Sequence, residues 1–185
     1  MMKSAIFLLW ILQSVGFASD RKPVSILEGF ELHSQQDLKI DTTDKATAIV
    51  FMSAVCPCSQ SHFSVLSQLA KEFPETLFVG IHSNAREHNP IRENSLALEG
   101  PQFSILRDAK SSYAKAFNAL KTPHVFLYNR KGELIYEGGI DNSKLASKAS
   151  EHYLYEALKA SKNNRPPEVS SFRTLGCAIE RNSEK

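Results

Sequence analysis

Apolar runs alternate with amphipathic segments along the chain, and their order predicts an α/β domain. The run "ATAIVFM" (46–52) is continuous, apolar and partly β-branched, which is typical of a buried central strand. The run "TLFVGI" (76–81) predicts a second buried strand. Between them, apolar residues at helical spacing predict a helix that ends at a proline, namely Phe63, Leu66, Ala70, Phe73 and Pro74. This order predicts a right-handed crossover between two parallel strands.

Segments on either side of this crossover predict further elements of the same domain. "VSILEGFEL" (24–32) predicts a first strand or hairpin arm, whereas "QQDLKIDTTDK" (35–45) is rich in turn residues. Asn89 and Pro90 predict the cap and the first residue of a helix that closes near Gly100. A flanking strand and a second helix therefore join the predicted crossover.

The second half of the chain continues the alternation of strands and helices. "QFSIL" (102–106) predicts a short strand, and "HVFLYNRKGELIYEG" (124–138) predicts a β-hairpin. Two more helices are predicted, one by Tyr113, Phe117 and Leu120 and the last by Tyr153, Leu154, Ala157 and Leu158. No repeat interrupts this order, so we expect one domain over residues 19–162. Residues 163–185 are expected to form a loose polar tail that carries Cys177.

The first residues have the pattern of a secretory signal. Lys3 precedes an apolar run (4–17), and "GFA" (16–18) has small residues at the two places that a signal peptidase reads. We expect residues 1–18 to be removed, so that the mature chain is secreted or periplasmic without stable membrane association. An uncleaved anchor helix is the alternative, although the run falls short of the roughly 20 residues that a membrane span needs.

Composition narrows the classes of function. Hydrophobic residues make up 42% of the chain and charged residues 23%, as in soluble globular proteins. The formal charge is +2 and no basic stripe with interleaved aromatics is present, so we expect no nucleic-acid partner. The three cysteines are an odd number, so in an oxidising compartment one must stay free, pair outside the chain or exchange partners.

Two of those cysteines lie in "SAVCPCSQ" (53–60), directly after the predicted central strand. Cys56 is in the position of a helix cap and Pro57 in the first helical position, which needs no N–H. Backbone N–H groups of Cys58 and Ser59 would then face the cap. A thiolate at this place is stabilised by the helix dipole, and its pKa falls below the usual value of about 8.5. The pattern predicts that Cys56 is a reactive nucleophile.

The thiol that reacts with Cys56 is left open by the sequence. Helical positions advance by about 100° each, so Cys58 is expected to point well away from Cys56. A bond between those two would require a distorted first turn, and strained disulfides are easily reduced. Cys177 lies 121 residues after Cys56, on a tail that could fold back over the site. It could equally be a fixed partner of Cys58.

Four histidines are candidates for a role near the thiol. His62 lies on the predicted active-site helix, where a solvent-exposed position is expected, and His124 begins a predicted strand. Either could stabilise a thiolate at Cys56. His82 and His88 follow the second strand, near the carboxyl ends of the parallel strands, where such folds place their sites.

Several segments together resemble a known family. "FMSAVCPCSQ" is similar to the active-site segment of thioredoxin-like proteins, and "LKTPHVFLYNRKGELIYEGGID" (120–141) looks like the second half of that fold. With the closing "LGCAIE" (175–180), residues 24 to 180 resemble the peroxiredoxin-like (AhpC/TSA-type) branch of thioredoxin-fold redoxins. The resemblance implies a thioredoxin-like fold with a central mixed β-sheet flanked by helices. It also implies that Thr122–Pro123 is a cis-proline turn beside Cys56, with the Thr122 backbone open to a substrate peptide.

The chain departs from both branches of this family. Thioredoxins keep a second cysteine where Ser59 stands and a tryptophan where Val55 stands. Peroxiredoxins have a proline where Ile49 stands, whereas Ser53 can replace their threonine, and they have an arginine where this chain has Thr122–Pro123. The departures favour disulfide exchange over efficient peroxide reduction.

The sequence thus predicts an exported thiol–disulfide oxidoreductase with a catalytic set of Cys56, Cys58, Cys177, Thr122 and Pro123. One alternative is a thiol peroxidase that acts as an antioxidant. Another is a copper or soft-metal binding protein, because thiolates and imidazoles suit Cu(I). We expect no cofactor. The expected partners are protein or small-molecule thiols and disulfides, and a thiol reductant protein.

Overall fold

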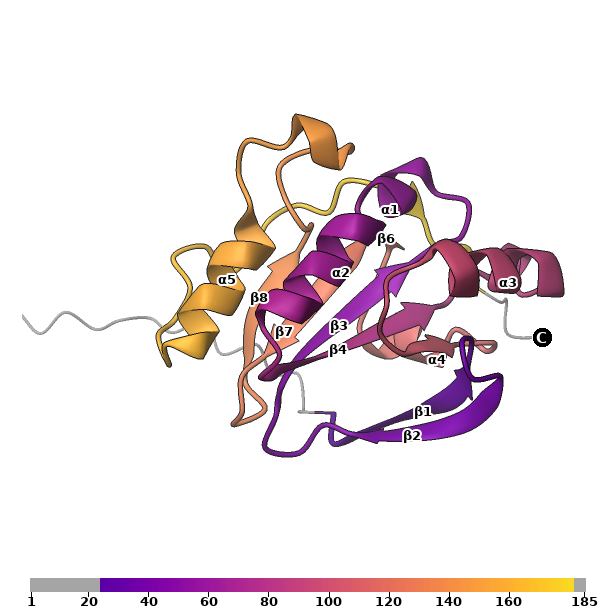
Figure 1. Cartoon of the computed structure of the whole chain (residues 1–185), viewed down its shortest axis with the longest axis horizontal. Helices are drawn as coiled ribbons and strands as arrows, with labels where there is room; N and C mark the ends of the chain where they lie inside the picture. The colour runs from indigo at the N-terminus through magenta and orange to yellow at the C-terminus, as the bar shows by residue number, and fades with distance from the viewer. Residues whose placement is uncertain (1–23, 182–185) are drawn as a thin grey trace, which may run out of the picture.

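A computed structural model describes residues 24–181, and a mixed seven-stranded sheet forms its centre (Figure 1). The predicted signal, residues 1–18, lies outside the described residues. The strand order in the sheet is β2-β1-β5-β4-β3-β7-β8. The strands are β1 (Ile26–Glu31), β2 (Gln36–Asp41), β3 (Ala46–Met52), β4 (Thr76–His82), β5 (Ile105–Arg107), β7 (His124–Tyr128) and β8 (Leu134–Gly138). Two short strands, β6 (Lys121–Thr122) and β9 (Cys177–Ala178), pair with each other outside this sheet.

The predicted crossover is confirmed. Strands β3 and β4 are parallel over their full length, from Ala46 opposite Thr76 to Met52 opposite His82. Strand β5 continues the parallel order, whereas β7 and β8 form the predicted antiparallel hairpin on the other side of β3. Every residue of β3 is buried, which explains its unbroken apolar run.

Helices cover both faces of the sheet and divide the core in two. They are α1 (Pro57–Ser61), α2 (Phe63–Glu72), α3 (Pro90–Glu99), α4 (Ser112–Ala116) and α5 (Tyr153–Lys162), with single 3₁₀ turns η1 (Ala85–Glu87) and η2 (Ala146–Lys148). Ala48, Val50 and Met52 of β3 pack with residues of α2, α3 and α5. Ile49 and Phe51 point the other way, toward the α4 side, because successive strand residues alternate between faces. The carboxyl end of β3 is thereby fixed between two packed layers.

Two sequence predictions about local structure are wrong, and a third is confirmed. Residues 35–45 contain strand β2, whose polar residues suit an edge strand that pairs only with β1 along its length. Helix α4 ends at Ala116, because Asn118 has a φ of 51°, and Leu120 is 56% exposed. The helix predicted from Phe63 to Phe73 is confirmed as α2, and His62 separates it from the short helix α1.

The tail is also more ordered than its polar composition predicts. Glu137 of β8 donates its N–H to the Ser170 carbonyl oxygen (3.0 Å), and Phe172 donates its N–H to the Glu137 carbonyl oxygen (3.1 Å). The Phe172 ring packs on Tyr153 of α5, with centroids 4.2 Å apart. Beyond this point the tail crosses toward α1 and ends in β9 (Figure 1). The domain boundary near residue 162 stays a prediction.

Candidate functional site

Cys56 lies where the sequence predicts it, between the end of β3 and the start of α1. Its backbone is extended (φ −73°, ψ 116°), and it is the N-cap of α1 with Pro57 in the first turn. Its carbonyl oxygen accepts the N–H of Gln60 at 2.9 Å. The residue is 2% exposed. A buried strand therefore delivers the thiol to the positive end of a short helix.

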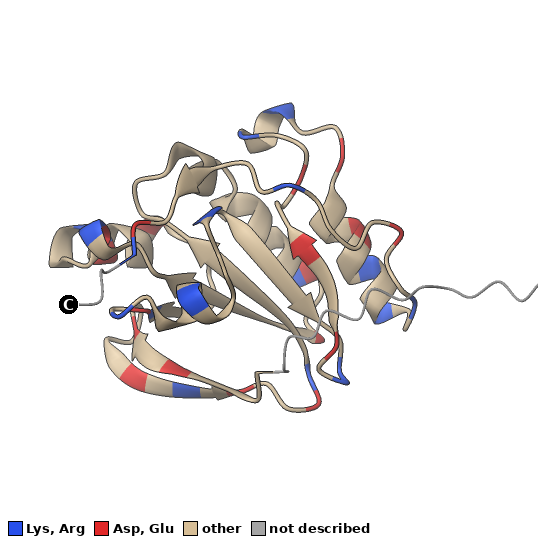
Figure 2. Cartoon of the chain, turned by 180° about the vertical axis from the view of Figure 1, so that it is seen from behind, with Lys and Arg blue, Asp and Glu red and all other residues tan. Residues whose placement is uncertain are grey.

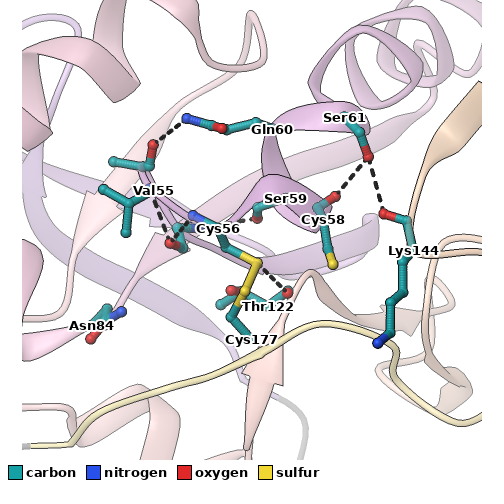
Figure 3. The surroundings of a disulfide bond; sticks show 12 residues. Val55, Cys56, Cys58, Ser59, Gln60, Ser61, Asn84, Thr122, Lys144 and Cys177 are labelled. Atoms are coloured by element: carbon teal, nitrogen blue, oxygen red, sulfur yellow. Dashed lines mark hydrogen bonds between the residues drawn. A yellow bond between two sulfur atoms is a disulfide. The ribbon is translucent and has the colours of Figure 1, made fainter.

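The Thr122–Pro123 peptide is cis, as the resemblance implied. The turn brings the Thr122 carbonyl oxygen to 3.3 Å from the Cys56 sulfur (Figure 3). Thr122 is only 2% exposed, because β9 pairs with it, and Cys177 is its partner residue. The expectation of an open Thr122 backbone is therefore wrong for this state of the protein.

Cys177 is bonded to Cys56 (Figure 3). Their Cα atoms are 5.9 Å apart, within the usual range for a disulfide. Cys58 is free and half-buried. Of the pairings that the sequence left open, the structure has the one between the helix cap and the tail.

All three cysteines nevertheless meet at one place. Within the part of the chain that the structure describes, the sulfur atoms of Cys56, Cys58 and Cys177 lie within 4.8 Å of one another. The prediction that Cys58 points well away is wrong, because Cys56 has extended rather than helical dihedrals. The angle of about 100° per residue applies only between helical positions. Reduction would thus create three neighbouring thiols.

Ser53 and Ser59 order the loop in front of Cys56. Ser53 Oγ accepts the N–H of Cys56 at 2.9 Å and the N–H of Val55 at 3.2 Å. Ser59 Oγ accepts the N–H of Ser53 at 3.1 Å. Ser59, which stands in place of the second thioredoxin cysteine, therefore stabilises the end of β3.

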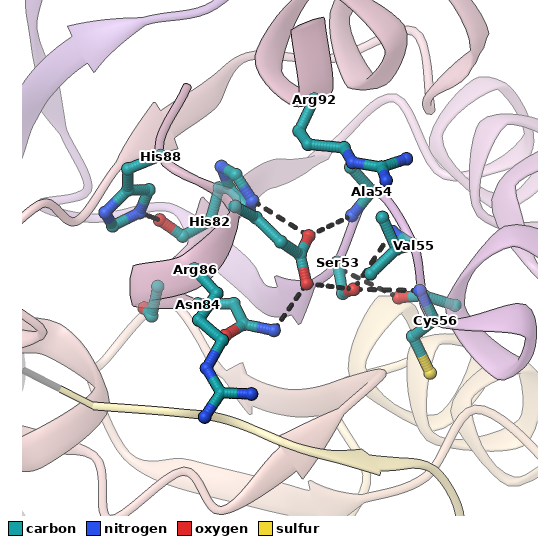
Figure 4. Close-up of polar contacts among 12 residues, drawn as sticks. Ser53, Ala54, Val55, Cys56, His82, Asn84, Arg86, His88 and Arg92 are labelled. Atoms are coloured by element: carbon teal, nitrogen blue, oxygen red, sulfur yellow. Dashed lines mark hydrogen bonds and ion pairs between the residues drawn. The ribbon is translucent and has the colours of Figure 1, made fainter. Parts of the chain in front are cut away.

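Glu87 is a buried carboxylate that sequence reasoning missed. It accepts from Ser53 Oγ (2.7 Å), from the N–H of Ala54 (2.7 Å), from His82 Nε2 (3.2 Å) and from the side-chain amide of Asn84 (Figure 4). Burial acts to raise the pKa of Glu87, but hydrogen bonds from His82 and Ser53, the charge of His82 and the Ala54 N–H together lower it. Its position in a polar loop after β4 gave no signal, because burial of that loop depends on the tertiary fold.

His62 is a second buried ionisable group beneath α1, and it is 1% exposed. Its Nδ1 lies 2.7 Å from the Cys58 carbonyl oxygen and its Nε2 lies 2.8 Å from Asp141 Oδ2. An acceptor at each ring nitrogen requires a proton on both, so the geometry favours the imidazolium. Burial acts to lower the pKa of His62, but Asp141 and the Cys58 carbonyl together raise it above 6.5. The prediction of a solvent-exposed His62 is wrong.

The other three candidate histidines contact neighbouring side chains and carbonyl groups. His82 is fully buried beside Glu87, and its carbonyl oxygen lies 3.0 Å from His88 Nε2. His124 is 7% exposed, and its ring packs on Phe126 with centroids 4.4 Å apart. His82 thus acts on the site through Glu87, by fixing the loop that carries Cys56.

Similar solved structures share this architecture. No protein-family model matches the chain, and no curated protein matches it. An uncharacterized conserved protein from Geobacillus kaustophilus is 25% identical, with a TM-score of 0.77 over 89% of this chain and 93% of that one. A secreted disulfide oxidoreductase of Mycobacterium tuberculosis, homologous to E. coli DsbE, is 22% identical, with a TM-score of 0.50 over 58% of this chain and 79% of that one. The thioredoxin domain of a Bacteroides vulgatus thiol-disulfide oxidoreductase is 11% identical, with a TM-score of 0.53 over 63% of this chain and 86% of that one.

The chain has a thioredoxin fold. In this thioredoxin-fold protein the position of Cys56 at a strand–helix junction, the cis-proline turn and the mixed sheet agree with the resemblance drawn from the sequence. No helix within residues 24–181 is both long and apolar enough to cross a membrane.

Proposed function

We propose that the protein is an exported thiol–disulfide oxidoreductase in which Cys56 is the nucleophile and Cys177 its partner within the chain. The observation that carries the proposal is the Cys56–Cys177 disulfide at a helix N-terminus beside a cis-proline turn. The fold shared with the secreted disulfide oxidoreductase of M. tuberculosis supports it, and export rests on the signal predicted over residues 1–18.

The reaction on a client disulfide would proceed in two exchanges. The Cys56 thiolate attacks one sulfur of the client, and the other client sulfur leaves as a thiolate. The Cys177 thiolate then attacks Cys56 in the mixed disulfide, and the second client sulfur leaves. The client gains two electrons and two protons, and the protein is left with its Cys56–Cys177 bond. A thiol reductant protein would then restore the two thiols. The reverse sequence oxidises a client dithiol and leaves the protein reduced, so a small-molecule or protein disulfide would be needed to restore the Cys56–Cys177 bond.

Partner choice is expected to depend on contacts at the site. Acidic and basic residues are interspersed over the ribbons seen from behind (Figure 2), and the net charge is +2. Such a distribution gives little long-range attraction for partners of one sign. Protein and small-molecule thiols or disulfides are therefore both proposed partners.

The test is thiol mapping of the full chain combined with its redox equilibrium. Peptide mass mapping after equilibration with glutathione buffers should follow one two-electron transition, in which only Cys56 and Cys177 change state. Cys177→Ser should accumulate a mixed disulfide at Cys56, and Cys56→Ser should abolish exchange. If Cys56→Ser exchanges disulfides as fast as the unchanged protein, the proposal fails.

A thiol peroxidase is the second candidate, because the same disulfide is the product expected of a peroxidase cycle. The Cys56 thiolate would take the terminal oxygen of a peroxide and become a sulfenic acid, with an alcohol or water as the other product. Condensation with the Cys177 thiol would then release water. Stopped-flow oxidation of the reduced protein by hydrogen peroxide tests this candidate. A rate no higher than that of a free thiolate would exclude it as a physiological activity.

A soft-metal site is the third candidate, and the cluster of three sulfur atoms favours it. Three neighbouring thiolates in the reduced protein suit Cu(I). Competition against a coloured Cu(I) chelator should then show binding by the reduced protein, weakened in Cys58→Ser and absent from the oxidised protein. Equal competition by the reduced and the oxidised protein would argue against a site at these sulfurs.

A further inference from the structure

The C-terminal segment lies on the site as an added strand. Cys177 is opposite Thr122 and Ala178 is opposite Lys121 in an antiparallel pair. The N–H of Ile179 donates to the Leu120 carbonyl oxygen at 2.9 Å. A cysteine bonded to Cys56 is thus held by main-chain pairing to the cis-proline turn.

The fit of this strand depends on two residues, Gly176 and Ile179. A Cβ atom added to Gly176 would lie 1.9 Å from the Thr122 carbonyl oxygen, so only glycine allows this approach. Ile179 is 8% exposed and belongs to the apolar cluster that contains Phe117 and Ala119. Ala178, between them, is exposed. The docked pattern is therefore glycine, cysteine, any residue and an aliphatic residue.

The remaining contacts do not require this chain in particular. The Ala85 N–H donates to the Glu180 carbonyl oxygen at 2.9 Å, and Arg181 Nη2 donates to the Ala119 carbonyl oxygen at 2.6 Å. The first uses only backbone atoms of the docked segment, and the second uses one guanidinium. An extended segment of another protein with the same pattern can form the same pairing.

We propose that this surface is a docking site for extended client segments of the pattern Gly-Cys-any-aliphatic, and that residues 174–181 occupy it as the chain's own competitor. The proposal rests on the proposed function, since the client cysteine must exchange with Cys56. In the oxidised protein the Cys56–Cys177 bond keeps the surface closed. In the reduced protein only non-covalent contacts hold the tail, so a client segment can replace it.

The test uses the full chain with Cys58→Ser and Cys177→Ser, which leaves Cys56 as its only thiol. The probe is the peptide of residues 174–181, Thr-Leu-Gly-Cys-Ala-Ile-Glu-Arg, with its cysteine bonded to thionitrobenzoate. The Cys56 thiolate attacks the peptide sulfur, the peptide–thionitrobenzoate bond breaks, and coloured thionitrobenzoate leaves with the electron pair. The rate of colour release measures peptide capture.

Three altered peptides probe the pattern. Peptides with Gly176→Ala or Ile179→Asp should react about tenfold more slowly or worse, as for central residues of an interface. The peptide with Ala178→Lys is the matched control and should react within about twofold of the parent, because that position is exposed. Equal rates for all four peptides would overturn the proposal and leave disulfide exchange intact. No reaction with any of them, or with oxidised glutathione, would instead remove the proposed function.

A second protein variant tests the competition. Adding Gly176→Ala to the protein itself should undock the tail and speed capture of the parent peptide several-fold. Thermal unfolding must show that this variant folds. If it folds, and the tail is not a competitor, its rate will equal that of the parent protein. Gly176→Ala can also fail to fold, and then Ile179→Ser in the protein provides the same comparison.

Discussion

Thr122 and Cys177 lie opposite each other in an antiparallel pair, and this pairing delivers the Cys177 sulfur to Cys56. The disulfide therefore depends on a backbone contact between segments that are far apart in the sequence. It also means that the redox state of the site and the position of the tail are coupled.

Reduction of the disulfide should lower the stability of the protein. The bond joins residues 121 positions apart, and in the chain-entropy model closing a loop of about 100 residues contributes about 4.7 kcal/mol. The free energy of unfolding, from urea titrations with and without reductant, should differ by about this amount. Cys58→Ser should leave the difference unchanged, because Cys58 is free. An equal stability of the oxidised and reduced forms would show that the tail is held without the bond.

Reduced Cys56 should ionise below the usual thiol range. As the N-cap of α1 it faces the positive end of the helix, which lowers thiol pKa values from about 8.5. The rate of iodoacetamide alkylation against pH, measured on Cys58→Ser/Cys177→Ser, should give a midpoint below that value. The control Cys56→Ser/Cys177→Ser retains Cys58 as its thiol and shows which part of the alkylation profile belongs to Cys56. A depressed midpoint that stays with Cys58 would reverse the two roles.

Glu87→Gln should disorder the loop in front of Cys56. The two carboxylate oxygens accept hydrogen bonds from Ser53, Ala54 and His82. Glutamine replaces one of these oxygens with an NH₂ group, which cannot accept, so at least one of the hydrogen bonds is lost. Loss of one such bond to a charged group costs about 1.5–3 kcal/mol. We expect a fall of that size in the free energy of unfolding and a change in the Cys56 alkylation rate. Glu156→Gln, on the exposed face of α5, is the control and should change neither quantity.

The lowered pKa of Glu87 also predicts how the free energy of unfolding changes at acidic pH. Its pKa is lowered in the folded protein, so the carboxylate contributes stability above its unfolded value of about 4.3. That contribution is lost as the pH falls through the lower folded value. The difference in unfolding free energy between the unchanged protein and Glu87→Gln should therefore shrink below pH 4 or so. A difference that grows toward acid would contradict this assignment.

The His62–Asp141 pair should make the free energy of unfolding decrease as the pH rises above neutrality. The pKa of His62 is raised above 6.5, so its contribution is fully present below that pH and is lost as the pH rises through the folded value. His62→Gln should cost about 3–5 kcal/mol in mildly acidic buffer, because it leaves Asp141 buried without its partner. This cost should decrease toward alkaline pH. His152→Gln, at an exposed position, should show no such trend.

The sequence predicted the parallel crossover, the hairpin and the helix-cap position of Cys56 because each is a local pattern. The apolar run of β3, the Cys56–Pro57 cap and the Thr122–Pro123 turn are readable within a few residues. The buried partners Glu87 and Asp141 were not found, since nothing near them in the sequence distinguishes them from surface carboxylates. Their burial follows from loops that meet only after the sheet has formed.

The order of the C-terminal tail could not be predicted from its sequence either. Its composition is polar, and its order comes from hydrogen bonds with β8 and β6, which lie elsewhere in the sequence. The choice between Cys58 and Cys177 as partner of Cys56 depended on that order. It also depended on the extended backbone of Cys56, which places Cys58 closer than helical geometry predicts.

The hydrogen bond between Phe172 and Glu137 of β8 limits how far Cys177 can move from the site. Cys177 lies only five positions after Phe172, and a fully extended chain spans about 3.3–3.6 Å per residue. While that contact holds, a Cys177 thiol released by reduction stays within roughly 17 Å of its anchor. Its local concentration near Cys56 is then in the millimolar range expected of short linkers. Once Cys56 is in a mixed disulfide, a dilute external thiol must therefore compete with the nearby Cys177 thiol for attack on that bond.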